Sequence, residues 1–178
     1  MHVRTILPQN PPFELQFSPD GLPWYLLART TPANDLFGEA YGAEMSAAWQ
    51  PFDAWRLRAH YTFLQMQLHA RYPAAGISEL EEGASPRHQI FLSSAVDLGR
   101  HVEWDLGLRH VDHLPSQRVR GYTELESRLA WKPTKNSELA IVGNNLLHDR
   151  HREFAPELLV YRKVAVGRAV YAKVTVRF

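Results

Sequence analysis

The sequence predicts an all-β protein, an antiparallel up-and-down meander of about eight strands in a chain of 178 residues. Three observations support this prediction. Apolar and polar side chains alternate through most of the chain, turn-forming residues separate the alternating segments, and no apolar run approaches the roughly 18 residues of a membrane helix. Successive side chains of a strand point to opposite sides of the sheet, so each segment has one apolar and one polar face. Residues 169–178 alternate most regularly and end on an aromatic side chain.

The expected strands follow one another in order. Residues 2–6 form a candidate first strand, and 13–17 with 24–29 form a small hairpin around the turn Ser18-Pro19-Asp20-Gly21. The other expected strands are 36–49, 55–67, 87–98, 101–112, 119–131, 137–146 and 169–178. Near the end of 137–146, the run Gly143-Asn144-Asn145 is expected to end or bulge the strand.

The connections between these strands alternate in length. Short turns are expected at 50–54, 99–100 and 132–136, and the intervening connections are 68–86, 113–118 and 147–167. In an antiparallel meander alternate connections lie at the same end, so the short turns share one rim and the longer loops share the other. Outer-membrane barrels have this asymmetry, with short periplasmic turns and longer outer loops.

Four of the five tryptophans fall on the apolar face close to the short turns. They are Trp49, Trp55, Trp104 and Trp131. Indole side chains are enriched at the level of the lipid headgroups. These four residues are therefore predicted to be membrane-interface aromatics.

The opposite face is strongly charged and is predicted to line a polar lumen. The candidate lumen-facing side chains are Glu103, Asp105, Arg109, Tyr122, Glu124, Glu126 and Arg128. The apolar face carries almost no charge, and Arg or Lys there would cost about 2–4 kcal/mol at mid-bilayer. We expect the charges to pair across strands as a ladder rather than to perform acid–base chemistry. The fold class then becomes the C-terminal part of a transmembrane β-barrel.

Composition excludes several function classes. The formal net charge of +1 gives no strong field for nucleic acid, and the absence of cysteine excludes disulfides and thiolate metal sites. The histidine pairs 110/113 and 148/151 are each spaced by three, which on a strand places the two side chains on opposite faces. We expect these histidines to be solvated. No metal site, cofactor or catalytic residue is predicted, and the chain is not expected to be an enzyme.

Several short motifs occur along the chain in a consistent order. They are 38–44 (GEAYGAE), 49–51 (WQP), 55–57 (WRL), 85–89 (SPRHQ), 139–147 (LAIVGNNLL), His151 with Glu153-Phe154, and 174–178 (VTVRF). Together they resemble the late barrel of TonB-dependent outer-membrane receptors. That family has a plugged barrel of about 22 strands, so the resemblance covers its C-terminal third or less.

This resemblance implies a function for the full receptor: uptake of a ferric siderophore, powered through TonB. Residues 1–178 would supply barrel wall, polar lumen face and outer loops, in contact with outer-membrane lipid. Val174, Val176 and Phe178 would form the C-terminal signal read by the barrel-assembly machinery. Residues 1–10 lack the apolar core of a signal peptide and no plug is recognisable, so we expect a fragment whose Met1 is internal.

Two alternatives remain open at this point. One is a self-contained eight-strand outer-membrane barrel for adhesion or envelope stability, with the charges packed in its interior. The other is a soluble lipocalin-like binder with the apolar face inside. The alternatives differ in sidedness. The lipocalin-like arrangement would pack Trp104, Leu106, Leu129 and Val174 at the centre and leave Glu124 and Arg128 in solvent.

Overall fold

The computed structural model describes residues 2–8, 14–17, 20, 23–27, 30–70, 82–154 and 165–178. These residues contain strands and no α-helix. The main sheet consists of β1 (His2–Pro8), β4 (Thr30–Phe52), β5 (Trp55–Ala70), β6 (His88–Leu98), β7 (Val102–Val111), β8 (Tyr122–Thr134), β9 (Ser137–Asn144) and β12 (Ala169–Val176). Two further pairs are β2 (Glu14–Phe17) with β3 (Pro23–Leu27), and β10 (Arg150–His151) with β11 (Val166–Gly167).

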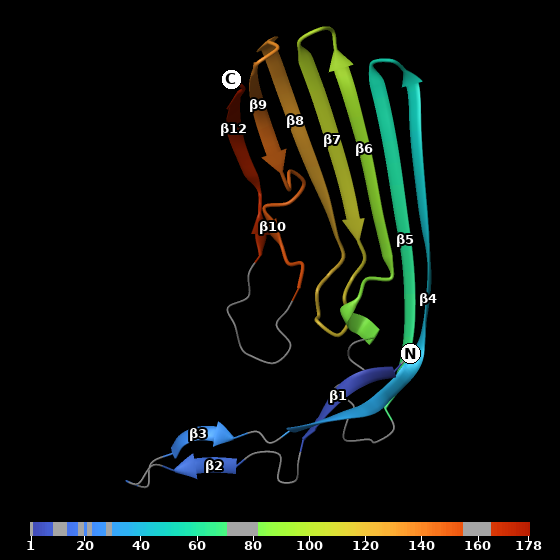
Figure 1. The fold of residues 1–178 in the computed structure, drawn as a ribbon, viewed down its shortest axis with the longest axis vertical. Coiled ribbons are helices and arrows are strands. Elements are labelled where there is room, and N and C mark those ends of the chain that lie inside the picture. Colours follow the sequence, from blue (N-terminus) through green and yellow to red (C-terminus); the bar gives the residue numbers. More distant parts are fainter. Residues whose placement is uncertain are drawn as a thin grey trace. The chain divides into compact units, whose positions relative to one another are not determined.

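The strand order of the main sheet is β1-β4-β5-β6-β7-β8-β9-β12, which can be followed from blue to red in Figure 1. From β4 onward the neighbours are successive strands, apart from the small β10–β11 pair between β9 and β12. The predicted all-β antiparallel meander is therefore confirmed. As described, the sheet is open, with β1 at one end of the order and β12 at the other.

The sequence pattern predicts one continuous segment. Contacts instead divide the chain into two compact units. The first comprises Met1–Tyr41 with Gln65–Ala84, and the second comprises Gly42–Leu64 with Ser85–Phe178. In the first unit β1 pairs with β4, and β2 pairs with β3 in the small hairpin that the sequence predicts. The backbones of β4 and β5 approach closely at Gly38, where a Cβ atom would lie 2.0 Å from the carbonyl oxygen of Gln67. Glycine is required at that position because any side chain would collide with the backbone.

The second unit holds the regular part of the meander. The pairs β6–β7 and β7–β8 each run for ten residue pairs without a register shift, from Gln89↔Val111 to Leu98↔Val102 and from Val102↔Trp131 to Val111↔Tyr122. The alternating sequence pattern explains this regularity, because a slip of one residue would move every apolar side chain to the wrong face. Between β6 and β7, Gly99 adopts a φ of 76°, a left-handed value that glycine tolerates.

Several predicted boundaries are wrong, and in two places the structure shows the reason. The predicted turn at 50–54 is shorter, because Gln50, Pro51 and Phe52 belong to β4 and only 53–54 form the turn. The Phe52 ring stacks on Trp55 across the hairpin, with centroids 6.4 Å apart, which extends the strand past the proline. The strand predicted from 119 begins at Tyr122, since Val119 instead bridges Leu114 in the preceding loop.

The short and long connections lie at opposite ends of the second unit. Figure 1 shows the turns β4–β5, β6–β7 and β8–β9 together at one end of their strands. The connections 112–121 and 145–168 leave from the other end; residues 155–164 of the latter lie outside the described part of the chain. Of the predicted loop 68–86, residues 71–81 also lie outside it, and 68–70 belong to β5.

Candidate functional site

The pairing registers place the charged side chains of the second unit on a single face. Directly paired residues of antiparallel strands share a face. The pairs are Glu103↔Ala130, Asp105↔Arg128, Gly107↔Glu126, Arg109↔Glu124 and Val111↔Tyr122. This side of the sheet, called the polar face below, therefore holds all seven predicted lumen-facing residues. Their role in lining a lumen stays a prediction.

The opposite side, called the apolar face below, is continuous across the strands. Its members in register on β6 to β8 are Leu92, Ser94, Val96, Leu98, Val102, Trp104, Leu106, Leu108, Leu125, Ser127, Leu129 and Trp131. On β9 and β12 it continues through Leu139, Ile141, Val170, Ala172, Val174 and Val176. None of these residues is charged, and many of their side chains are exposed.

The two faces of the sheet differ in how far their side chains are exposed to solvent, and the apolar face is the more exposed one. Glu124 on the polar face is 8% exposed, and Ala130 and Ala140, which pair with each other farther along the same face, are buried. On the apolar face Leu129 is 46% exposed and Val174 is 67% exposed. A soluble sheet packed on an apolar core would show the reverse. In the second unit the apolar face therefore holds strongly exposed side chains, whereas part of the polar face is buried.

Ion pairs cross the strands of the polar face. Arg128 on β8 contacts Asp105 on β7 at 2.7 Å and Glu138 on β9 at 2.6 Å. It also lies 3.5 Å from Glu103, which pairs with Lys132. These contacts join three strands through one guanidinium, whose planar fork suits several carboxylates at once. Glu138 and Lys132 were not among the candidates named from the sequence.

A second ion pair extends this arrangement toward β5. The two guanidinium nitrogens of Arg56 donate to the two carboxylate oxygens of Asp97 at 2.7 and 2.8 Å. This bidentate geometry is the strongest form of the Arg–carboxylate pair. Several charges of the polar face are thus matched between neighbouring strands.

Residues that pair directly across neighbouring strands form a row on one face of the sheet. Three of the four predicted interface tryptophans lie in two adjacent rows of the apolar face. Trp55 and Trp104 both pair with Val96, and Trp131 pairs with Val102 one row nearer the short turns. The indole N–H of Trp55 donates to Ser94 Oγ at 2.9 Å, and that of Trp104 donates to Ser127 Oγ at 3.1 Å. The hydroxyls of Ser94 and Ser127 on this face thereby each accept a hydrogen bond from an indole.

Trp49, the fourth tryptophan, is exposed near the end of β4. The structure shows the rows of the other three; the assignment of all four to a membrane interface stays a prediction.

The C-terminal strand β12 is shorter than predicted. It ends at Val176, and the backbone N–H of Arg177 still donates to Asn136 O at 2.8 Å. Val174 and Val176 lie exposed on the apolar face, and Phe178 beyond the strand is fully exposed. Their role as an assembly signal stays a prediction.

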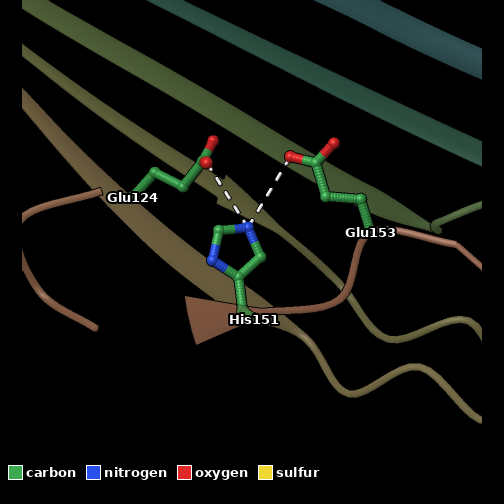
Figure 2. A group of neighbouring side chains, drawn as sticks. All are labelled: Glu124, His151 and Glu153. Carbon is green, nitrogen blue, oxygen red and sulfur yellow. Dashed lines mark ion pairs between the residues drawn. The ribbon is translucent and has the colours of Figure 1, made fainter. Parts of the chain in front are cut away.

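A compact group of side chains lies at the long-loop end of the polar face, and is called the Glu124–His151–Glu153 cluster below. His151 Nε2 lies 3.3 Å from Glu124 Oε1 and 3.6 Å from Glu153 Oε1. Figure 2 shows both carboxylates directed at this one ring nitrogen. The His151 side chain is only 9% exposed, and neither ring nitrogen makes a hydrogen bond of good geometry with the described residues.

Two neighbouring side chains, Tyr122 and Arg109, contact the cluster. The Tyr122 ring stacks on the His151 ring with centroids 4.2 Å apart, and its hydroxyl donates to Glu153 Oε1 at 3.4 Å. Arg109 Nη1 donates to Glu124 Oε2 at 3.1 Å and lies 3.5 Å from Glu153 Oε1. The cluster therefore contains two carboxylates, one guanidinium and one imidazole.

The loop after β9 places His151 over β8. Asn145 turns the chain with a φ of 52°, a left-handed value that asparagine adopts more readily than most residues. The next backbone N–H, of Leu146, donates to Leu125 O at 3.0 Å. Asn145 Nδ2 donates to Val166 O at 3.2 Å, and Val166 pairs with His151 in the β10–β11 ladder.

Replacing Asn145 should loosen this loop. We expect Asn145→Ala to lower the free energy of unfolding by about 1–3 kcal/mol, because a buried hydrogen bond is lost and alanine disfavours the left-handed backbone. Asn145→Gly should cost less, since glycine accepts the backbone conformation. Chemical denaturation of the folded chain measures both, with Asn144→Ala as the neighbouring control. Equal losses for alanine and glycine would contradict the backbone argument.

The cluster lies past the end of the apolar face. That face ends at the row of Leu108 and Leu125, because the next row holds His110 and Thr123, whose side chains hydrogen-bond at 2.8 Å. Beyond this row, burial raises the pKa of Tyr122 to about 12, with the nearby Arg109 opposing the effect. Tyr122 therefore remains a neutral hydroxyl at physiological pH.

The structure separates both histidine pairs named from the sequence. His110 bonds to Thr123, whereas His113 lies 2.7 Å from Asp112 and lowers the pKa of that carboxyl. His148 is exposed, and His151 meets two carboxylates instead. The spacing between histidines alone does not reveal the acid that β8 supplies to His151. The strand parity that places Glu124 on the polar face was the available signal.

The structure thus defines an all-β antiparallel meander with one charged and one apolar face. Comparison of the chain with models of known protein families, with curated proteins and with solved structures finds no match. Among the described residues, no helix is both long enough and apolar enough to span a membrane.

Proposed function

We propose that this chain forms part of the barrel wall of a TonB-dependent outer-membrane receptor that takes up iron–siderophore complexes. The observation that carries the proposal is the sidedness of the second unit. The apolar face is exposed and uncharged across successive strands, whereas the better-covered face carries matched ion pairs. A barrel wall between lipid and a polar lumen needs this distribution.

Three further features support the proposal. The tryptophan rows lie near the short turns, as an interfacial aromatic girdle would. The long connections leave from the opposite end, where outer loops would meet a ligand. The open ends of the sheet, at β1 and β12, would be satisfied by pairing with further strands in a closed barrel, since lipid cannot hydrogen-bond a free strand edge.

In this proposal the chain's own work is structural. The apolar face contacts outer-membrane lipid, the polar face lines the lumen, and Val174, Val176 and Phe178 address the barrel-assembly machinery. TonB and the ferric siderophore are partners of the whole receptor. The motif resemblance supplies this assignment, and the sidedness of the sheet supports its membrane part.

Growth under iron limitation tests the receptor assignment. A strain lacking the gene should lose growth on one class of ferric siderophore, tested with hydroxamate, catecholate and carboxylate types. The complete gene should restore growth only when TonB is functional, and the product should fractionate with the outer membrane. Restoration without TonB, or an unchanged phenotype with an outer-membrane product, would favour the small barrel for adhesion or envelope stability. A detergent-free soluble product would favour the lipocalin-like binder.

A further inference from the structure

We infer that the Glu124–His151–Glu153 cluster is a binding site for a divalent transition-metal ion of the Zn²⁺ class. The observation behind this inference is the convergence of three metal-ligating side chains on one point, at the loop end of the polar face. Among the described residues these are the ones whose ligand atoms come together in this way, all lying within 4.8 Å of one another. The inference is independent of the receptor assignment.

The distances fit tetrahedral coordination. Zn²⁺ binds imidazole nitrogen and carboxylate oxygen at about 2.0–2.2 Å, so adjacent ligand atoms of a tetrahedral site lie roughly 3.3–3.6 Å apart. His151 Nε2 lies 3.3 Å from Glu124 Oε1 and 3.6 Å from Glu153 Oε1. The histidine nitrogen therefore already lies at nearly this spacing from both carboxylate oxygens, and the ligand atoms of the three residues lie within 4.8 Å of one another.

The burial of His151 supports the same assignment. Its side chain is nine-tenths buried, yet both ring nitrogens lack a hydrogen-bond partner among the described residues. A buried polar atom without a partner costs about 1–3 kcal/mol, and metal coordination at Nε2 would remove that cost for one nitrogen. Figure 2 shows this nitrogen facing the two carboxylates rather than the protein backbone.

The surroundings set the charge and the geometry of the site. Arg109 donates a hydrogen bond to Oε2 of Glu124, which leaves Oε1 of the same carboxylate directed at His151. Hydrogen bonds from such outer partners orient metal ligands and are costly to remove. With a neutral imidazole, the two carboxylates and the one guanidinium sum to a single negative charge, which favours a cation.

The ligand set selects the class of ion. One imidazole and two carboxylates suit Zn²⁺ and similar first-row ions better than Ca²⁺ or Mg²⁺, which prefer oxygen alone. Three protein ligands leave the fourth tetrahedral position for water or an external donor atom, unlike the closed four-ligand structural zinc sites. The expected occupant is thus an ion with one open coordination position, at the long-loop end of the polar face.

Equilibrium dialysis against Zn²⁺ tests the inference, with the full chain refolded in detergent micelles and bound metal counted by elemental analysis. We expect one equivalent for the wild type. His151→Gln and Glu124→Gln should each weaken binding by at least about 100-fold, the upper end of the cost of losing an outer-shell partner. Co²⁺ in place of Zn²⁺ should give the intense visible absorption of a tetrahedral site.

The chain offers one matched control for the histidine ligand and one for the glutamate ligands. His148→Gln removes an exposed histidine of the same loop, and Glu126→Gln removes an acid of the same strand and face outside the cluster. Both should retain one equivalent. Glu153→Gln is the second test if a buried variant fails to fold, as judged by circular dichroism. Absence of binding by the folded wild type, or equal loss in ligand and control variants, would overturn the inference and leave the cluster as an ion pair of imidazolium with carboxylate.

Discussion

Leu106→Arg is expected to lower the free energy of unfolding of the chain in a lipid bilayer by about 2–4 kcal/mol. Leu106 occupies the central row of the apolar face, between Ser94 on β6 and Ser127 on β8. If this face contacts hydrocarbon, the new guanidinium sits near mid-bilayer, where the cost of a charge is greatest. Urea-induced unfolding from vesicles, followed by tryptophan fluorescence, measures the difference.

The matched control places the same side chain on the polar face. Ser93 lies there on β6, opposite Gly107, in a row that continues to Glu126. We expect Ser93→Arg to change the free energy of unfolding by less than about 1 kcal/mol, as for other partly exposed charges. A larger cost at Ser93 than at Leu106 would contradict the assignment of the two faces.

Arg128→Met should produce the second large effect, a loss of about 2–3 kcal/mol. Removing the guanidinium leaves Asp105 and Glu138 without the cation that joins them across β7, β8 and β9. Breaking a fully buried ion pair costs about 3–5 kcal/mol, and the expected value is lower because the Arg128 side chain is 29% exposed. Denaturant unfolding of the wild type and variant gives the difference directly.

A triple variant distinguishes the loss of ion pairing at Arg128 from the loss of packing by its side chain. Adding Asp105→Asn and Glu138→Gln to Arg128→Met removes the unpaired carboxylates, so we expect about half or more of the lost stability to return. Lys135→Met, in the β8–β9 turn, removes a cation that contacts none of these acids and should be nearly neutral. Absence of rescue would show that Arg128 acts through packing of its aliphatic stem instead.

The strands and their faces were predictable because they depend on a local pattern. The two-residue alternation from Val102 to Leu108 and from Leu125 to Trp131 fixes which side each residue takes, and the registers follow from matching these faces. This alternation predicts that the seven lumen candidates share a face, and the structure places them on one face. The same alternation also places Glu138 on the polar face.

The missed features depend on tertiary contacts. Pro51 suggested a turn, but stacking of Phe52 on Trp55 carries β4 past it. Val119 alternates like a strand residue, yet its partner is Leu114 in the loop. His151 reaches Glu124 only because Asn145 turns the chain and β10 pairs with β11, and spacing along the sequence cannot reveal such a contact.

Sidedness is the central claim, and site-directed spin labelling in lipid vesicles tests it most directly. The chain has no native cysteine, so single labels can be placed without background at Leu129 and Val174 on the apolar face and at Ala130 and Lys173 on the polar face. The account predicts that labels at 129 and 174 collide readily with oxygen dissolved in the lipid and rarely with a water-soluble nickel complex, whereas labels at 130 and 173 are shielded from lipid. Lipid-type accessibility at 130 and 173, with 129 and 174 protected from both reagents, would contradict it.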